Sequence, residues 1–294
     1  MPLQQSRLVN NPDQGKGVTM GEDNKSNLVF WGVRGTCPVS GENRNKYGGH
    51  TPCSSLETPD GSILIIDAGT GIKELGDWLM SDMCKMPPIL HIFLTHFHLD
   101  HIMGLPFFGP LNSPDVRLIF YSDILPEETE KHLSGFMGGK YFPISFKQTQ
   151  SEKIFHRMPK GGLAVGGSHI SCCPLNHPQG SIAYKIKDEN NTIVIATDTE
   201  HPLHGIDQKL ADFAAGSDML VYDATFTPAE YQAGRIGWGH STWLEGTKLA
   251  KQAGVKKLFL SHLNPDHQDS QIDDIVSLAR EEFLDTYGAK ERSG

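Results

Sequence analysis

One short run of this chain holds most of its candidate chemistry. Thr95-His96-Phe97-His98-Leu99-Asp100-His101 places three histidines and an aspartate within six positions. It follows the apolar run 89–94, which has the length of a buried strand, and it precedes the apolar residues 102–105. We therefore expect these side chains on a loop between a strand and a helix, where a rigid scaffold can present them. Imidazole nitrogens and a carboxylate are ligands typical of zinc, manganese or iron, so the run predicts a metal site.

Three further candidate ligands lie later in the chain, each directly after a predicted strand. They are His177 after the strand at 169–174, Asp198 after the strand at 192–196, and His262 after the strand at 257–260. Polar residues at the tips of several strands can meet at one edge of a sheet. We therefore expect these three side chains to lie close to the 96–101 loop.

Length and composition bound the class of protein. With 294 residues, 38% apolar and 21% charged, the chain is typical of a globular protein near the upper size for one hydrophobic core. The net charge of −9 argues against a general nucleic-acid binder, although bound cations could still attract an anionic substrate. No apolar stretch approaches the roughly 20 residues that span a bilayer, and no signal pattern opens the chain. A cytoplasmic location without membrane contact is therefore expected, and the five cysteines are expected to be reduced.

Apolar runs and helical spacing predict the elements that position these residues. Strands are expected at 28–33, 54–57, 62–66, 89–94, 116–121, 169–174, 181–186, 192–196, 219–222 and 257–260. Helices are expected at about 71–80, from Pro126 onward, and at 207–214, 242–253 and 270–287. Residues 135–167 show no clear period, and no element is predicted there. The pattern favours an α/β fold in which two sheets pack together and are covered by helices.

Domain organisation follows from the polar start of the chain. Residues 1–27 are rich in Asn, Gln, Gly, Asp and Lys without any period, and we predict a flexible leader there. Residues 28–294 are expected to form one domain around the metal site.

The order of the candidate ligands resembles that of the metallo-β-lactamase superfamily over roughly residues 28–270. This resemblance implies an αββα sandwich with a pair of metal ions at one edge of the two sheets. It assigns His96, His98 and His177 to the first metal, Asp100, His101 and His262 to the second, and Asp198 as the bridge between them. Two divalent ions are implied, zinc first, with manganese or iron as alternatives.

A second segment resembles one branch of that superfamily. Val221-Tyr222-Asp223-Ala224-Thr225-Phe226, followed by Gly239-His240-Ser241-Thr242, is similar to the ribonuclease Z and cyclic-nucleotide phosphodiesterase branch. The ribonuclease pattern typically has Glu where this chain has Asp223. The resemblance implies that a metal-bound hydroxide attacks phosphorus, with Asp100 orienting it or accepting its proton. His240, kept cationic by Asp223, would then protonate the leaving alkoxide as general acid.

One departure from ribonuclease Z bears on the substrate. Ribonuclease Z enzymes usually carry a long basic arm that grips tRNA, inserted between the later histidine and the bridging aspartate. Here only 21 positions separate His177 from Asp198, and two predicted strands with a turn fill them. Together with the acidic net charge, this favours a small phosphodiester, a cyclic nucleotide first, and no stable nucleic-acid complex. A homodimer is expected by analogy with relatives.

Two other activities stay open from the sequence. An acyl hydrolase acting on a lactone, thioester or β-lactam would share all seven ligands without needing His240. A tRNA 3′-processing endonuclease would share the whole site.

Several other residues have both a functional and a structural interpretation. Asp67 either accepts a hydrogen bond from a ligand imidazole or caps the following helix. For Arg34 a structural ion pair is favoured over a phosphate contact, and His50 is a candidate for the pocket wall. A group of four aromatic residues either forms a lid or a platform that stacks a base, or packs in the core or at a dimer contact: Phe136, Tyr141, Phe142 and Phe146.

Overall fold

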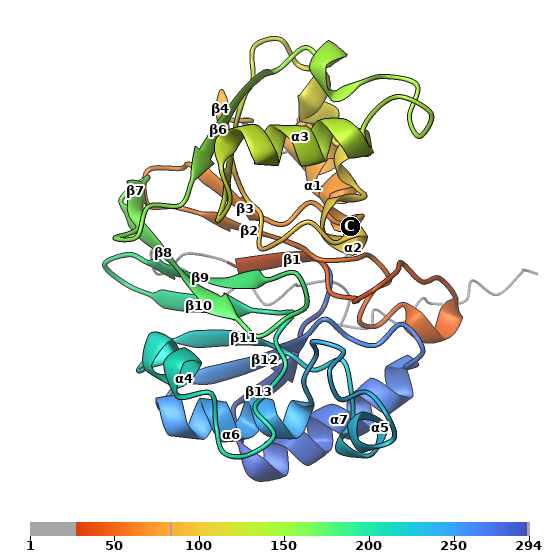
Figure 1. Ribbon diagram of the computed structural model, residues 1–294, viewed down its shortest axis with the longest axis vertical. Helices are drawn as coiled ribbons and strands as arrows, with labels where there is room; N and C mark the ends of the chain where they lie inside the picture. The colour runs from red at the N-terminus through yellow and green to blue at the C-terminus, as the bar shows by residue number, and fades with distance from the viewer. Residues whose placement is uncertain (1–27, 83, 293–294) are drawn as a thin grey trace, which may run out of the picture.

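Two β-sheets stacked face to face, with helices on both outer faces, form the αββα sandwich that the sequence predicted (Figure 1). The computed structural model describes residues 28–82 and 84–292, so the predicted flexible leader at 1–27 lies outside the described residues. Within them, the first sheet has the strand order β1-β2-β3-β4-β5-β6 and the second the order β13-β12-β11-β10-β9-β8-β7.

The strands of the first sheet are β1 Leu28–Gly32, β2 Cys53–Glu57, β3 Ile63–Ile66, β4 Ile89–Phe93, β5 Arg117–Ser122 and β6 Glu152–Arg157. Those of the second are β7 Leu163–Val165, β8 Ser168–Leu175, β9 Ser181–Lys187, β10 Thr192–Ala196, β11 Met219–Asp223, β12 Lys257–Ser261 and β13 Thr286–Gly288. The α-helices are α1 Gly71–Leu79, α2 Leu99–Ile102, α3 Pro126–Phe136, α4 Gln208–Ala214, α5 Pro228–Gln232, α6 Trp243–Ala253 and α7 Asp269–Glu282.

Both faces of the central strands are buried, which explains why the sequence shows continuous apolar runs there. In β10, Ile193 and Ile195 face the layer between the two sheets, whereas Val194 and Ala196 face α4 and α6. In β3, Leu64 lies in that same inter-sheet layer, whereas Ile65 packs against the helices of the first sheet. The fold therefore has three apolar layers, one between the sheets and one under each set of helices.

The strand directions place the candidate ligands at one edge. Strands β3 to β6 run parallel, and so do β10 to β13. β8 pairs antiparallel with β9, which pairs antiparallel with β10, so β8 runs in the same direction as β10. The carboxyl ends of β4, β8, β10 and β12 are followed by the candidate ligands, and ligand sites in open α/β sheets lie outside such ends.

The segment 135–167, for which no element was predicted, contains two strands. β6 pairs parallel with β5 at the edge of the first sheet, and its side chains are exposed or half-buried, so it lacks the apolar alternation of a core strand. β7 forms a hairpin with β8. Phe146 is buried in the core under the helices of the first sheet, whereas Tyr141 is 84% exposed. The aromatic group is thus largely core packing.

The prediction for the last helix was wrong at its end. α7 ends at Glu282, and the chain continues as β13, which pairs with β12. Phe283 already has an extended backbone, and its carbonyl accepts a hydrogen bond from the Thr286 hydroxyl at 2.6 Å. Pairing with β12 therefore ends the helical pattern. Of the described helices, none combines the length and apolarity needed to cross a membrane.

Glu291 yields a prediction for the dependence of stability on pH. Burial raises the pKa of Glu291 to about 7, against the opposing hydrogen bonds from the backbone N–H groups of His50 and Gly49 and the charge of Arg34. Since the folded state binds this proton more tightly than the unfolded state, Glu291 should lower the free energy of unfolding as pH rises from about 4.5 to 7. The cost across this window is on the order of 3 kcal/mol.

Urea unfolding of wild type and Glu291→Gln between pH 4 and 8 measures this effect. The stability of Glu291→Gln relative to wild type should increase through the window and stay level above it. A difference that does not change with pH would contradict the assigned proton.

Candidate metal centre

The seven predicted ligands lie together at one edge of the sandwich. These seven residues form three groups of three, and within each group the ligand atoms lie within 4.8 Å of one another. These groups are His96, His98 and His177; His96, His101 and Asp198; and Asp100, His101 and His262. The members come from four separate segments of the chain, which the two sheets bring to one place.

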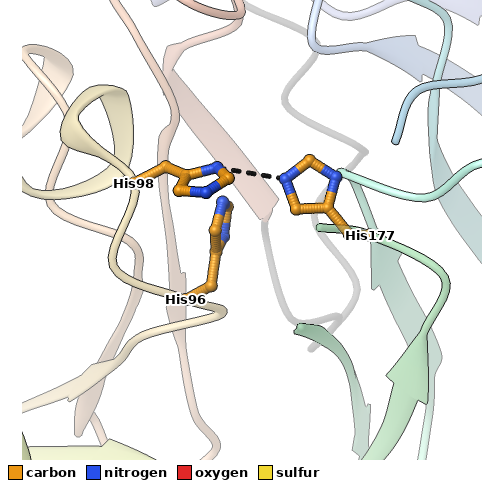
Figure 2. Close-up of side chains that lie close together, drawn as sticks. All are labelled: His96, His98 and His177. Carbon is orange, nitrogen blue, oxygen red and sulfur yellow. Dashed lines mark hydrogen bonds between the residues drawn. The ribbon is translucent and has the colours of Figure 1, made fainter. Parts of the chain in front are cut away.

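The first group contains three imidazoles whose rings point toward one another (Figure 2). His98 Nδ1 lies 3.1 Å from His177 Nε2. The ring of His96 lies 4.5 Å from that of His98 and 4.9 Å from that of His177, measured between centroids. His96 and His98 precede α2, and His177 follows β8, so the two sheets each contribute to this group.

The second group contains Asp100, His101 and His262. Asp100 Oδ2 lies 3.5 Å from His101 Nε2 and 3.3 Å from His262 Nε2. The three side chains are nearly inaccessible to solvent. A cation at this place would meet two imidazole nitrogens and one carboxylate oxygen.

Asp198 lies between the two groups, as its predicted bridging role requires. Its Oδ1 is 3.8 Å from both His96 Nε2 and His177 Nε2, and its Oδ2 is 3.1 Å from His101 Nε2. His262 Nε2 is 3.3 Å from Oδ1. One buried carboxylate therefore faces imidazoles of both groups.

Unpaired buried atoms indicate that this donor set fits metal ions. His96 Nε2, His101 Nε2 and Asp198 Oδ2 are buried, and none makes a hydrogen bond of good geometry to a described residue, although the last two lie 3.1 Å apart. Such atoms are costly unless something satisfies them. Five imidazoles and two carboxylates arranged around them suit borderline cations such as zinc, manganese or iron.

The second ring nitrogen of each candidate histidine ligand is held by a neighbour, which sets the ring orientation. His101 Nδ1 donates to Asp67 Oδ2 at 2.8 Å, and His177 Nδ1 donates to the Gly239 carbonyl at 2.7 Å. The other partners are Thr95 Oγ1 for His96, Gln179 Oε1 for His98 and Thr225 Oγ1 for His262. Asp67 thus accepts from the imidazole of a candidate ligand. It does not cap α1, because the residue at the N-cap of that helix is Thr70.

Several residues of the site have a left-handed backbone conformation, which is uncommon for residues other than glycine. Five described non-glycine residues have a positive φ angle, and three of them are Asp67, Asp198 and His262, at 62°, 59° and 54°. Each comes at or just after the end of its strand, and this left-handed conformation turns the side chain out of the strand direction. Asp and His tolerate it better than most residues, but it still costs energy that packing must offset.

Burial and charge act against each other in the pKa values of these groups. Burial lowers the pKa of His101 and of His262, but neighbouring carboxylates outweigh it and raise the pKa of His262 to about 9. Burial raises the pKa of Asp198, yet His101 and His262 bring it well below its ordinary value. Metal ions bind neutral imidazole, so binding here must displace protons and should strengthen as pH rises.

A histidine–aspartate pair lies directly beside the ligands. His240 Nδ1 donates to Asp223 Oδ2 at 2.9 Å, and the His240 ring stacks on that of His262 with centroids 4.8 Å apart. Asp223 is fully buried, and it also accepts hydrogen bonds from the backbone of Asp198 and from Thr225. Aspartate therefore reaches the imidazole where the ribonuclease pattern has the longer glutamate.

The structure separates Arg34 and His50 from this chemistry. The buried Arg34 guanidinium donates to the carbonyls of Gly48, Asn264 and His267. Its Nη2 lies 3.7 Å from Asp269 Oδ1, which is the structural ion pair favoured from the sequence. His50 lines a cavity of about 390 Å³ with Arg44 and Glu291, and none of the candidate ligands lines it.

Sequence reasoning missed several supporting residues. Thr36 donates its backbone N–H to Asp100 Oδ2 at 2.8 Å, and Gln179 and Thr95 orient ligand rings. Glu200 accepts hydrogen bonds from the backbone N–H groups of Gly237 and Gly239, next to His240. Of the supporting residues, Thr95 in the 95–101 run and Thr225 in the Asp-Ala-Thr segment lay in motifs that the sequence had singled out, although no role was predicted for either.

The ligand assignment predicts how metal content changes on substitution. Wild type should bind about two divalent ions per chain. His98→Ala, in the first group, and His262→Ala, in the second, should each reduce this to about one, and Asp198→Ala should lose both because it faces both groups. Metal analysis after dialysis measures the content, and the change in melting temperature on chelation measures the linked stability.

His204→Ala is the matched control, since His204 is exposed and lies in no candidate ligand group. It should keep the wild-type metal content. Full metal content in Asp198→Ala would contradict the bridging role.

Comparison with known proteins identifies the family of this chain. The family model described as "Beta-lactamase superfamily domain" matches residues 63–263. Ribonuclease Z of Pseudomonas putida is 32% identical over 311 aligned positions, covering 90% of this chain and 92% of the relative. Ribonuclease Z of Oceanobacillus iheyensis is 27% identical, covering 71% and 82%.

Among solved structures, the metallo-beta-lactamase fold protein YhfI from Bacillus subtilis has a TM-score of 0.67 at 21% identity, with 90% of this chain and 96% of that chain covered. This likeness confirms the fold. The chain belongs to the metallo-β-lactamase superfamily, in its ribonuclease Z-like branch, and is a metal-dependent hydrolase.

Proposed function

We propose that this chain is a dinuclear metal-dependent phosphodiesterase that hydrolyses a small phosphodiester, with a cyclic nucleotide as the first candidate. The observation that carries the proposal is the His240–Asp223 pair stacked against His262. A hydrolase that releases a good leaving group has no need of an acid at this position. One that expels an alkoxide from phosphorus does, because an alkoxide leaves poorly unless it is protonated.

The pair is arranged to deliver a proton. With Nδ1 donating to Asp223, the His240 imidazole keeps Nε2, which no described residue hydrogen-bonds, for the substrate. The buried Asp223 carboxylate would stabilise the imidazolium before transfer. Asp223 cannot rotate away, since Thr225 and the backbone of Ser241 also donate to it.

The residues would hold two metal ions as the family pattern implies. One ion would be bound by His96, His98 and His177, the other by Asp100, His101 and His262, and both by Asp198. When bound, the two ions would supply Lewis-acid stabilisation of the phosphoryl charge and lower the pKa of a coordinated water. Asp100, which accepts a hydrogen bond from the Thr36 N–H, would orient the attacking water or accept its proton.

Two features favour a small substrate. The segment from His177 to Asp198 consists of β9, β10 and their connections, with no inserted arm. The chain also carries a net charge of −9, which opposes an extended contact with a polyanion. A homodimer and a cytoplasmic location stay predictions.

A second candidate function is tRNA 3′ processing. The relative from Pseudomonas putida, matched over 90% of this chain, is named ribonuclease Z. The two candidates share the same ligands and the same acid, so they differ in how the rest of the substrate is held.

A substrate panel separates the candidates. Purified metal-loaded protein would be assayed on adenosine 3′,5′-cyclic phosphate, a cyclic dinucleotide, an aryl phosphodiester, a lactone and a precursor tRNA. Preference for a cyclic nucleotide would support the proposal. Faster cleavage of the precursor tRNA would favour the endonuclease, and turnover of the lactone alone would favour an acyl hydrolase.

The acid role of His240 gives a sharper prediction. His240→Ala should keep both metals and lose about 10²- to 10⁴-fold in kcat on a diester with an alkoxide leaving group. An aryl diester should be affected much less, because aryloxide leaves without protonation. His204→Ala serves as the control and should match wild type on both substrates. Equal losses of kcat on the two diesters would contradict the assignment of His240 as the general acid.

A further inference from the structure

A short glycine loop leads directly into His240. Residues 234–239, Gly-Arg-Ile-Gly-Trp-Gly, connect the end of α5 to the catalytic-pair histidine, and we call them the glycine loop. Its three glycines have positive φ angles of 114°, 85° and 85°. At Gly239, a side chain would collide with Pro178 and with the ring of His177. The loop thus packs directly against a candidate ligand.

A buried carboxylate holds this loop in place. Glu200 Oε1 accepts from the Gly237 N–H at 2.7 Å and from the Tyr231 hydroxyl at 2.6 Å, and its Oε2 accepts from the Gly239 N–H at 2.8 Å. Glu200 is only 8% exposed and comes two residues after Asp198. The Gly239 carbonyl accepts from His177 Nδ1. The glycine loop is therefore tied to the strand tip that carries the bridging aspartate and to a ligand histidine.

This fixed loop presents a large aromatic side chain to solvent. Trp238 is 55% exposed, although burial would stabilise an indole. Its ring lies 6.5 Å from that of Phe226, and the Phe226 ring lies 6.0 Å from that of His240. The Arg235 guanidinium stacks on the Trp238 ring at 4.4 Å. An exposed tryptophan with a paired cation thus comes two residues before the proposed acid, and the Phe226 ring lies between the two rings.

We propose that Trp238, backed by Arg235, is the platform on which the nucleobase of the leaving group stacks. This inference rests on the proposed phosphodiesterase function. His240 would protonate the departing oxygen, so the leaving alcohol must lie on the His240 side of the phosphorus. Trp238 comes two residues before His240 and is 55% exposed, so it offers this alcohol an aromatic surface that is open to solvent.

The chemistry of the platform matches a nucleotide. Every base offers a flat π-face, and an aromatic side chain that stacks on it contributes binding that depends little on base identity. Arg235 adds a positive charge beside the ring in a protein with net charge −9, which suits an anionic ligand. Because Glu200 already holds the glycine loop, the loop would lose little conformational entropy when a ligand binds.

The test compares matched substrates with and without a base. Wild type, Trp238→Ala and Trp238→Phe would be assayed on adenosine 3′,5′-cyclic phosphate and on a methyl riboside 3′,5′-cyclic phosphate, which lacks the base. Trp238→Ala should raise KM for the adenosine diester by roughly 5- to 100-fold and leave the base-free diester nearly unchanged. Trp238→Phe should retain most of the wild-type affinity.

Two control variants separate the platform from effects on the loop or the fold. Ile236→Ala changes another exposed apolar side chain of the glycine loop, and Leu284→Ala changes one that is 80% exposed between α7 and β13. Both should behave as wild type on the two substrates. Metal content of every variant should stay at the wild-type level.

A binding measurement keeps the outcome independent of turnover. Calorimetric titration of metal-loaded protein with adenosine monophosphate and with ribose 5-phosphate should show tighter binding of the former, and Trp238→Ala should remove that difference. Equal effects of Trp238→Ala on both ligands, or none on either, would overturn the platform. If wild type cleaved no phosphodiester, the proposed function would fail, while the titration would still decide whether Trp238 binds a base.

Discussion

Four aspartates buried at one edge of the two sheets impose the constraint on which the rest of this structure depends. Asp67, Asp100, Asp198 and Asp223 are each at most 7% exposed. A buried carboxylate is costly unless a positive charge or several hydrogen bonds accompany it. Each of these aspartates has a histidine nitrogen close by. The site is therefore a balanced array of anions and imidazoles, and two divalent cations would complete the balance.

The same array links the metal ligands to the proposed acid. Asp223 accepts from His240 and from the backbone N–H of Asp198, so one carboxylate contacts both the proposed acid and the proposed bridging residue. Thr225 connects Asp223 to His262 through its hydroxyl. Because these groups share partners, substitutions among them should not be energetically additive.

The superfamily fold alone does not select a reaction, since one fold hosts many chemistries. What distinguishes this chain is the surroundings of the ligands: the His240–Asp223 pair, the short connection between His177 and Asp198, and the glycine loop that carries Trp238. The first concerns the leaving group, and the other two concern the size and chemistry of the substrate. His240 and the glycine loop lie between α5 and α6, outside the strands, where change costs the core little.

The sequence by itself determined the fold class and the local ligand run. Continuous apolar runs such as 192–196 encode burial on both faces, and the spacing in 95–101 is a local pattern that survives without knowledge of the fold. Only tertiary structure decided the edge strand β6, the end of α7 and the partners that orient each imidazole. Those depend on contacts between residues far apart in the chain, such as Gln179 with His98 and Glu200 with Gly239, and no periodicity in one strand or helix records them.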